Sequence, residues 1–68
     1  MTQSNRVWVA YGAAGAVGSI RESGGGTFVV QMADADEPVG QYPELEIAKR
    51  ALHARMRPGA DRPEFHRH

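Results

Sequence analysis

Three histidines are the side chains of this sequence best suited to metal chemistry. His66 and His68 are separated by one residue, and His53 lies further upstream. Imidazole nitrogens bind zinc, copper and nickel. However, no rigid element is predicted around His66 and His68, and the sequence places no third ligand beside them. We therefore predict a solvated polar segment here and no metal site.

The sequence contains no arrangement typical of nucleophilic catalysis. Cysteine is absent, which excludes a thiolate nucleophile, a thiolate zinc site and a disulfide framework. Ser4, Ser19 and Ser23 all lie outside the Gly-x-Ser-x-Gly context of a nucleophile elbow. Asp34 and Asp36, two residues apart, fit a hairpin loop better than an acid–base pair. We therefore expect a protein that is not an enzyme.

A glycine-rich segment, Gly12 to Gly18, directly follows an apolar run. Its Gly-x-x-Gly-x-x-Gly spacing, with Asp34 after the next apolar strand, resembles the dinucleotide-binding turn of the extended short-chain dehydrogenases. That resemblance implies a tight turn and a helix N-terminus that hold a pyrophosphate, with the acid on a ribose hydroxyl. Nucleotide binding is therefore one candidate function.

Other features favour a hairpin connection at this segment. Gly15 and Gly18 would each weaken the helix that the dinucleotide turn requires. A parallel sheet also needs helices on both faces, and only one further helix is predicted. Tyr42 is followed four residues later by Glu46, where those enzymes have a lysine. We therefore keep a nucleotide-binding fragment only as the third alternative.

The hydrophobic pattern predicts the elements that must position these residues. Runs rich in β-branched and aromatic residues predict strands at 6–11, 17–23 and 27–32, with a short fourth strand at 39–42. A weak helix over 14–22 is the alternative for the second strand. An amphipathic helix is predicted for residues 44–57, starting with Pro43 at its first position and stopped by Pro58 and Gly59. Its expected apolar side comprises Leu45, Ile47, Ala48, Ala51, Leu52 and Met56.

This order of elements predicts an α+β fold. A small antiparallel sheet of three to four strands would be covered on one face by the single C-terminal amphipathic helix. We expect residues 1–57 to form one small domain and residues 58–68 a polar tail, either loose or held by Phe65.

Side-chain alternation predicts what lies on the uncovered sheet face. If Val7, Val9 and Tyr11 point at the helix, together with Phe28, Val30 and Met32, the opposite face carries Arg6, Trp8, Ala10, Thr27, Val29 and Gln31. A tryptophan beside an arginine on an uncovered face is typical of a binding surface. The alternative is that Trp8 packs under the C-terminal tail. The partner-binding candidates are Arg6, Trp8, Arg21, Val29 and Gln31.

A second resemblance covers residues 18–57. The runs Gly18-Ser19-Ile20-Arg21, Gly26-Thr27-Phe28-Val29-Val30 and Gly40-Gln41-Tyr42 are followed by Leu45, Ala48 and Leu52. This pattern is similar to the three-strands-plus-helix DNA-binding domain of plant ethylene-response factors and to the arm-binding domain of phage tyrosine integrases. The resemblance implies that the sheet face opposite the helix enters the major groove. It carries DNA contacts onto Arg21, Thr27 and Gln31, with Arg6 and Trp8 as neighbours.

The sequence departs from that pattern in two ways. Pro43 and Glu44 replace the Thr or Ser at the helix start, and the strands are less basic. The 68 residues balance 8 Lys+Arg against 8 Asp+Glu, which argues against strong nonspecific binding to nucleic acid. The charges are nevertheless separated along the chain, with acids over 34–46 and most cations over 49–68.

Membrane and export signals are not predicted. The longest uncharged run, residues 7–20, is too short and too glycine-rich to span a bilayer, and residues 1–6 lack the basic-then-apolar order of a signal peptide. We therefore expect a cytoplasmic protein.

Taken together, these patterns predict a small non-enzymatic interaction module. It would bind a protein partner, or a second copy of itself, through an open sheet face or a sheet edge. A DNA-binding module of the integrase-arm type is the alternative. No cofactor, membrane or small-molecule substrate is expected.

Overall fold

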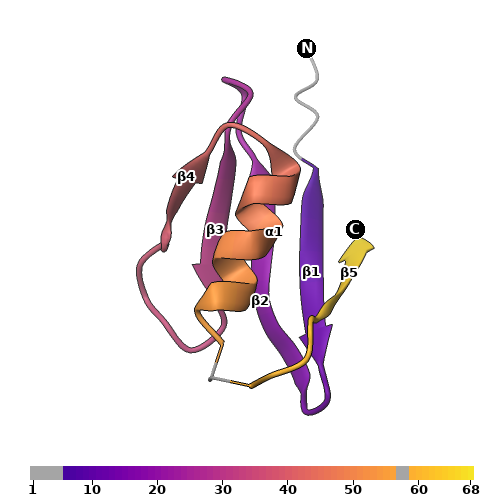
Figure 1. Ribbon diagram of the computed structural model, residues 1–68. Coiled ribbons are helices and arrows are strands. Elements are labelled where there is room, and N and C mark those ends of the chain that lie inside the picture. Colours follow the sequence, from indigo (N-terminus) through magenta and orange to yellow (C-terminus); the bar gives the residue numbers. More distant parts are fainter. Residues whose placement is uncertain (1–5, 57–58) are drawn as a thin grey trace.

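The computed structural model describes residues 6–56 and 59–68. In these ranges, five antiparallel strands form one sheet and one helix packs against one of its faces (Figure 1). The elements are β1 (Val7–Gly12), β2 (Gly15–Glu22), β3 (Phe28–Met32), β4 (Gly40–Tyr42), α1 (Leu45–Ala54) and β5 (Glu64–Arg67). The strand order is β4-β3-β2-β1-β5. The predicted α+β fold is confirmed, with a sheet of five strands where three to four were expected.

The glycine-rich segment forms the hairpin that joins β1 to β2. Gly15 has a φ of 118°, a conformation that residues with a Cβ rarely adopt. At Gly18, a Cβ would lie 2.8 Å from the backbone oxygen of Gln31 and 3.2 Å from the Leu52 side chain. Glycine at this position therefore lets β3 and α1 come close to β2. The predicted strand is confirmed and the alternative of a weak helix is wrong.

The core lies between α1 and the centre of the sheet. Five hydrophobic side chains in it are fully buried: Ala10, Ile20, Val30, Ala48 and Leu52. Partly buried side chains surround them: Trp8, Val17, Phe28, Met32, Val39, Tyr42, Leu45, Met56 and Phe65. Because the core is a single layer between one helix and one sheet, each central side chain contributes a large share of the buried apolar surface.

The helix begins one residue later than predicted. Glu44 has an extended conformation, with φ −137° and ψ 147°, and α1 starts at Leu45. Pro43 therefore precedes the helix and does not occupy its first position. The helix ends at Ala54, and the predicted stop at Pro58 lies outside the described residues.

Ile47 does not belong to the apolar side of α1. Ile47 is 39% exposed. It lies five residues before Leu52, and five helical steps of about 100° each place the two side chains on different sides of the helix. The residues that pack on the sheet are Leu45, Ala48 and Leu52, followed by Met56 after the helix ends. Their spacing of three and four residues is the helical repeat.

The two faces of β1 are the reverse of the prediction. Trp8 pairs with Ile20, and Ala10 pairs with Gly18, so both lie on the side of the core. The Trp8 ring is 5.9 Å from the Phe28 ring. Both alternating sets of β1 are apolar, so the hydrophobic pattern does not fix its orientation. The assignment of Phe28, Val30 and Met32 to the helix side of β3 is correct.

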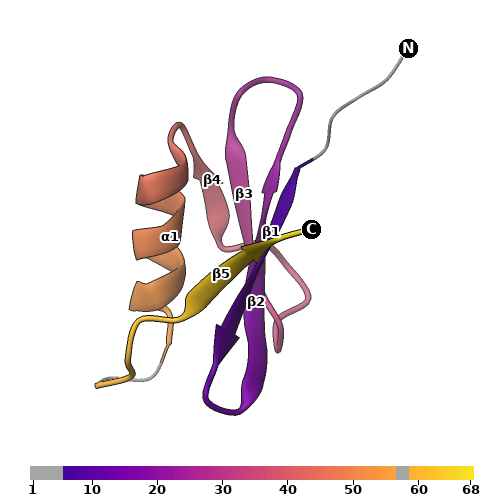
Figure 2. The same cartoon turned by 90° about the vertical axis from the view of Figure 1, so that its right-hand side faces the viewer.

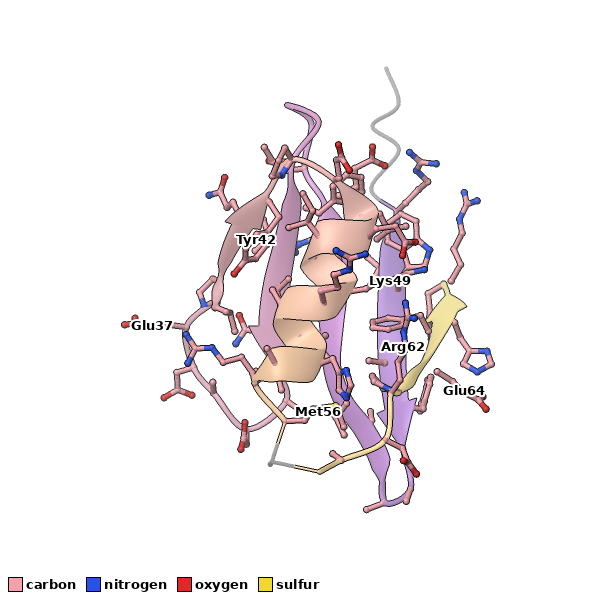
Figure 3. The ribbon with its side chains drawn as sticks, viewed as in Figure 1. Glu37, Tyr42, Lys49, Met56, Arg62 and Glu64 are labelled. Carbon is pink, nitrogen blue, oxygen red and sulfur yellow. The ribbon has the colours of Figure 1, made fainter. Side chains whose placement is uncertain are left out.

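Residues 64–67, predicted as part of a tail, instead form the edge strand β5. It pairs antiparallel with β1, placing Phe65 opposite Ala10. Lys49 projects from α1 on the side of β5 (Figure 3), with its Nζ 5.3 Å from the centroid of the Phe65 ring. His53 also links α1 to the segment that precedes β5, because its Nε2 donates a hydrogen bond to the carbonyl oxygen of Ala60 at 3.0 Å. Phe65 therefore fixes an ordered strand.

No helix within the described ranges combines the length and the apolar character needed to cross a lipid bilayer.

Replacing Leu52 with alanine tests the packing of α1. We expect Leu52→Ala to lower the free energy of unfolding by about 2 to 5 kcal/mol, because it leaves a cavity over β2. Ile47→Ala, on the exposed side of the same helix, is the control and should change stability by only about 0.5 kcal/mol. Urea denaturation followed by circular dichroism measures both. Equal stability of the two variants would contradict the assigned helix face.

The orientation of β1 is tested by Trp8→Ala. Loss of this ring from the core side should lower the free energy of unfolding by about 3 kcal/mol. Tyr11→Ala, which truncates a ring on the other face of the strand, should cost much less. If Trp8→Ala were as stable as the wild type in urea, the strand would have the opposite orientation.

Candidate interaction surface

The sheet face that α1 leaves uncovered is the candidate functional site, and we call it the open face. Figure 2 shows α1 on one side of the sheet, while the other side carries no helix or strand from the part of the chain described. The strand pairing assigns the following side chains to the open face: Val7, Val9, Tyr11, Ser19, Arg21, Val29, Gln31, Gln41, Glu64, His66 and His68.

Apolar side chains of the open face lie on both sides of the central strand β2, which itself contributes Ser19 and Arg21. Val7 and Val9 follow each other along β1, and Val29 lies on β3 beyond Arg21. Val7 and Val29 line a shallow recess together with Ser19, Arg21 and Gln31. Tyr11 continues the β1 stripe and is 37% exposed. A flat surface with this composition buries apolar area readily when another surface packs on it.

Tyr11 is surrounded by ionisable side chains from the end of the chain. Its ring meets the His66 ring edge-on, with the centroids 5.3 Å apart, and its Oη lies 3.4 Å from Nε2 of His68. His66 Nε2 lies 3.3 Å from a carboxylate oxygen of Glu64. In the described ranges, no group of three or more His, Cys, Asp or Glu side chains is placed to hold a metal ion. This cluster offers hydrogen bonds and an aromatic edge.

An acidic loop borders the open face. The loop between β3 and β4 carries Asp34, Asp36 and Glu37, and it projects on the side of the sheet away from α1 (Figure 2). Gln31 holds it there, because its side-chain amide donates to the carbonyl of Ala35 at 2.6 Å and lies 3.4 Å from that of Glu37. The side chain of Gln31, which was predicted to contact a partner, therefore holds the acidic loop in place.

The structure brings together only some of the predicted binding residues. Arg21, Val29 and Gln31 lie on the open face as predicted. Trp8 and Arg6 do not: Trp8 packs on the core, and the Arg6 guanidinium lies 5.7 Å from its ring. For Trp8, the reason is the reversed orientation of β1.

Thr27 lies at the turn between β2 and β3. Its hydroxyl is hydrogen-bonded to that of Ser23 at 2.7 Å. It therefore helps to close the hairpin, and its hydroxyl already has a partner within the chain.

The prediction missed Val7, Val9, Tyr11, His66 and His68 as open-face residues. For the β1 residues, the available signal was the size of Trp8, since a large indole gains more from the core than a valine does. For the histidines, the available signal was that Phe65 lies between polar neighbours. This alternation is typical of an edge strand with one side chain toward the core and its neighbours on the other face.

An ion pair joins the start of β1 to the end of β2 beside the core. Arg6 Nε donates to Glu22 Oε1 at 2.5 Å. This hydrogen bond is the main cause that lowers the pKa of Glu22 below its ordinary value, and it raises the pKa of Arg6. The side chain of Arg6 is 43% exposed, so solvent screens the pair.

The lowered pKa of Glu22 gives its stabilisation a defined pH dependence. Since the carboxyl binds its proton less readily when folded, its contribution is complete above about pH 4.3, the ordinary Glu pKa, and is lost as the pH falls through the folded pKa. Glu22→Gln should therefore be less stable than the wild type at pH 7, with the difference shrinking near pH 3. Glu37→Gln, in the exposed loop, should keep the wild-type dependence. A gap that stayed constant across urea denaturation curves at both pH values would contradict this.

Comparison with known proteins gives no family for this fold and surface. A scan against models of protein families finds no match to the chain, and searches of curated proteins and of solved structures find none either.

Proposed function

We propose that this protein is a small non-enzymatic interaction module that binds a protein partner through the open face. The observation that carries the proposal is the stripe of Val7, Val9 and Tyr11 along β1, with Val29 nearby, on a face that no described helix or strand covers. Removing such a stripe from water is the main favourable contribution to most protein–protein association.

The charge of the open face favours a protein over DNA as the partner. Among its assigned side chains, Arg21 is the one arginine or lysine, while Glu64 and the acidic loop lie at its border. A DNA-binding face gathers several cations to neutralise phosphates. Apolar side chains mixed with polar groups and few charges are instead usual in a protein–protein interface.

DNA binding of the integrase-arm type is the second candidate. The observation that favours it is that β2, β3 and β4 are consecutive antiparallel strands followed by α1, which is the order that the resemblance implies. Arg21 also lies on the face opposite the helix. Against it, Gln31 already donates to the acidic loop, and Arg6 and Trp8 lie on the side of the core.

A dinucleotide site has less support from the geometry. The element that directly follows Gly12 is strand β2, which begins at Gly15, and not a helix. The helix N-terminus that would hold a pyrophosphate is therefore missing from this position.

The proposal is tested by a charge placed in the apolar stripe. Immobilised wild-type protein, Val9→Lys and Ile47→Lys are each exposed to host lysate with and without nuclease treatment. Partners of the open face should be retained by the wild type and by Ile47→Lys, and retention should fall at least tenfold on Val9→Lys. Circular dichroism of each variant checks that the fold is intact.

Two results would contradict the proposal. Equal retention by the wild type and Val9→Lys would show that the stripe is not the binding surface. Loss of all retained proteins after nuclease treatment would favour the DNA-binding alternative, and a steep loss of DNA affinity with added salt would support it.

A further inference from the structure

We propose that the partner of the open face is a second copy of this chain, packed face to face with its strands antiparallel to those of the first copy. This inference rests on the proposed function and adds the identity and orientation of the partner.

The open face carries opposite charges at its two ends. Arg21 pairs with Val7 at the end where β1 begins, and His68 continues the same row by donating its backbone N–H to the Val7 carbonyl at 2.7 Å. Glu64 pairs with Tyr11 at the other end of β1. The acidic loop leaves β3 at this same end of the sheet (Figure 1). The face therefore has a basic end and an acidic end, with Val9 and Ser19 in the row between them.

This distribution is complementary to itself in one orientation. A two-fold axis between the sheets and perpendicular to the strands sets the basic end of each copy against the acidic end of the other. The same axis stacks Val9 on Val9 of the second copy and sets Val7 against its Tyr11. A two-fold axis parallel to the strands would instead bring the two Arg21 side chains to the same end, which like-charge repulsion disfavours.

The free edges of the sheet are poorly suited to the same task. β4 has three residues and β5 has four, and β5 carries Glu64, His66 and Arg67. Short and charged edge strands disfavour pairing with another sheet. Self-association through the face, as in the two layers of a β-sandwich, therefore fits the chain better than extension of the sheet.

The size of the face sets the strength of this contact. Five strands about 4.8 Å apart and three rows of side chains spanning about 17 Å give an area of about 400 Å² per copy. A total of about 800 Å² lies in the range of weak and reversible association. The protein should therefore be monomeric when dilute and dimeric when concentrated.

Sedimentation equilibrium of the purified protein over a concentration series tests the inference. The wild type should follow a reversible monomer–dimer equilibrium that weakens with added salt. Val9→Lys should raise the dissociation constant at least tenfold, and Ile47→Lys should leave it unchanged. Arg21→Glu should raise it severalfold, because each basic end becomes a second acidic end.

Arg21→Glu also reports the orientation of the two copies. If the two-fold axis were parallel to the strands, Arg21→Glu would replace repulsion between two arginines with repulsion between two glutamates. An unchanged dissociation constant would therefore overturn the antiparallel arrangement. The chain has no native cysteine, which allows a second measurement with single-cysteine variants. A thiol cross-linker of about 10 Å, the separation of packed sheets, should link Val9→Cys to itself and should not link Ile47→Cys.

The remaining outcomes separate this inference from the proposed function. A wild type that stays monomeric at millimolar concentration, while a lysate protein is still retained in a Val9-dependent manner, would overturn self-association and leave the interaction module standing. A monomeric wild type without Val9-dependent retention would overturn both. A dimer that Val9→Lys does not weaken would place the contact elsewhere.

Discussion

The structure depends on one constraint: a single ten-residue helix must hold together a sheet of five strands. It does so by lying close to the middle strand, where Gly18 leaves room for Leu52 and Ala10 and Ala48 add small surfaces around it. Close approach compensates for a short helix, because dispersion contacts fall off steeply with distance. A single helix covers only one face of the sheet, and within the described ranges the other face is the open face.

The elements could be predicted where composition and period agree. Phe28, Val30 and Met32 alternate with polar or smaller neighbours, so both the strand and its core side follow from the sequence. In β1, valines alternate with tryptophan and alanine, and the choice between the two faces depends on where Trp8 packs, which is beside Ile20 and Phe28 on strands further along the chain. β5 itself was missed because only Phe65 is apolar among its four residues.

The two errors, the reversed orientation of β1 and the omission of β5, also affected the prediction of the candidate site. Arg21, Val29 and Gln31 were placed correctly because β2 and β3 were, but the role of Gln31 in holding a loop depends on backbone carbonyls that no side-chain pattern reveals. Arg6 and Trp8 were assigned to the wrong face, and the valines of β1 took their place. A slip of one residue in a strand exchanges its whole set of side chains, so a surface hypothesis is only as good as the orientation of its central strand.

The pairing of β1 with β5 also links the open face to the order of folding. Tyr11 and His68 meet across 57 positions of sequence, whereas β1, β2 and β3 join through short hairpins. Closing a long loop has a larger entropic cost and comes later than hairpin formation. The hairpins thus form while the row of Glu64, His66 and His68 is still absent from the sheet. A nascent chain on the ribosome therefore presents an incomplete open face, which is completed only after β5 has docked.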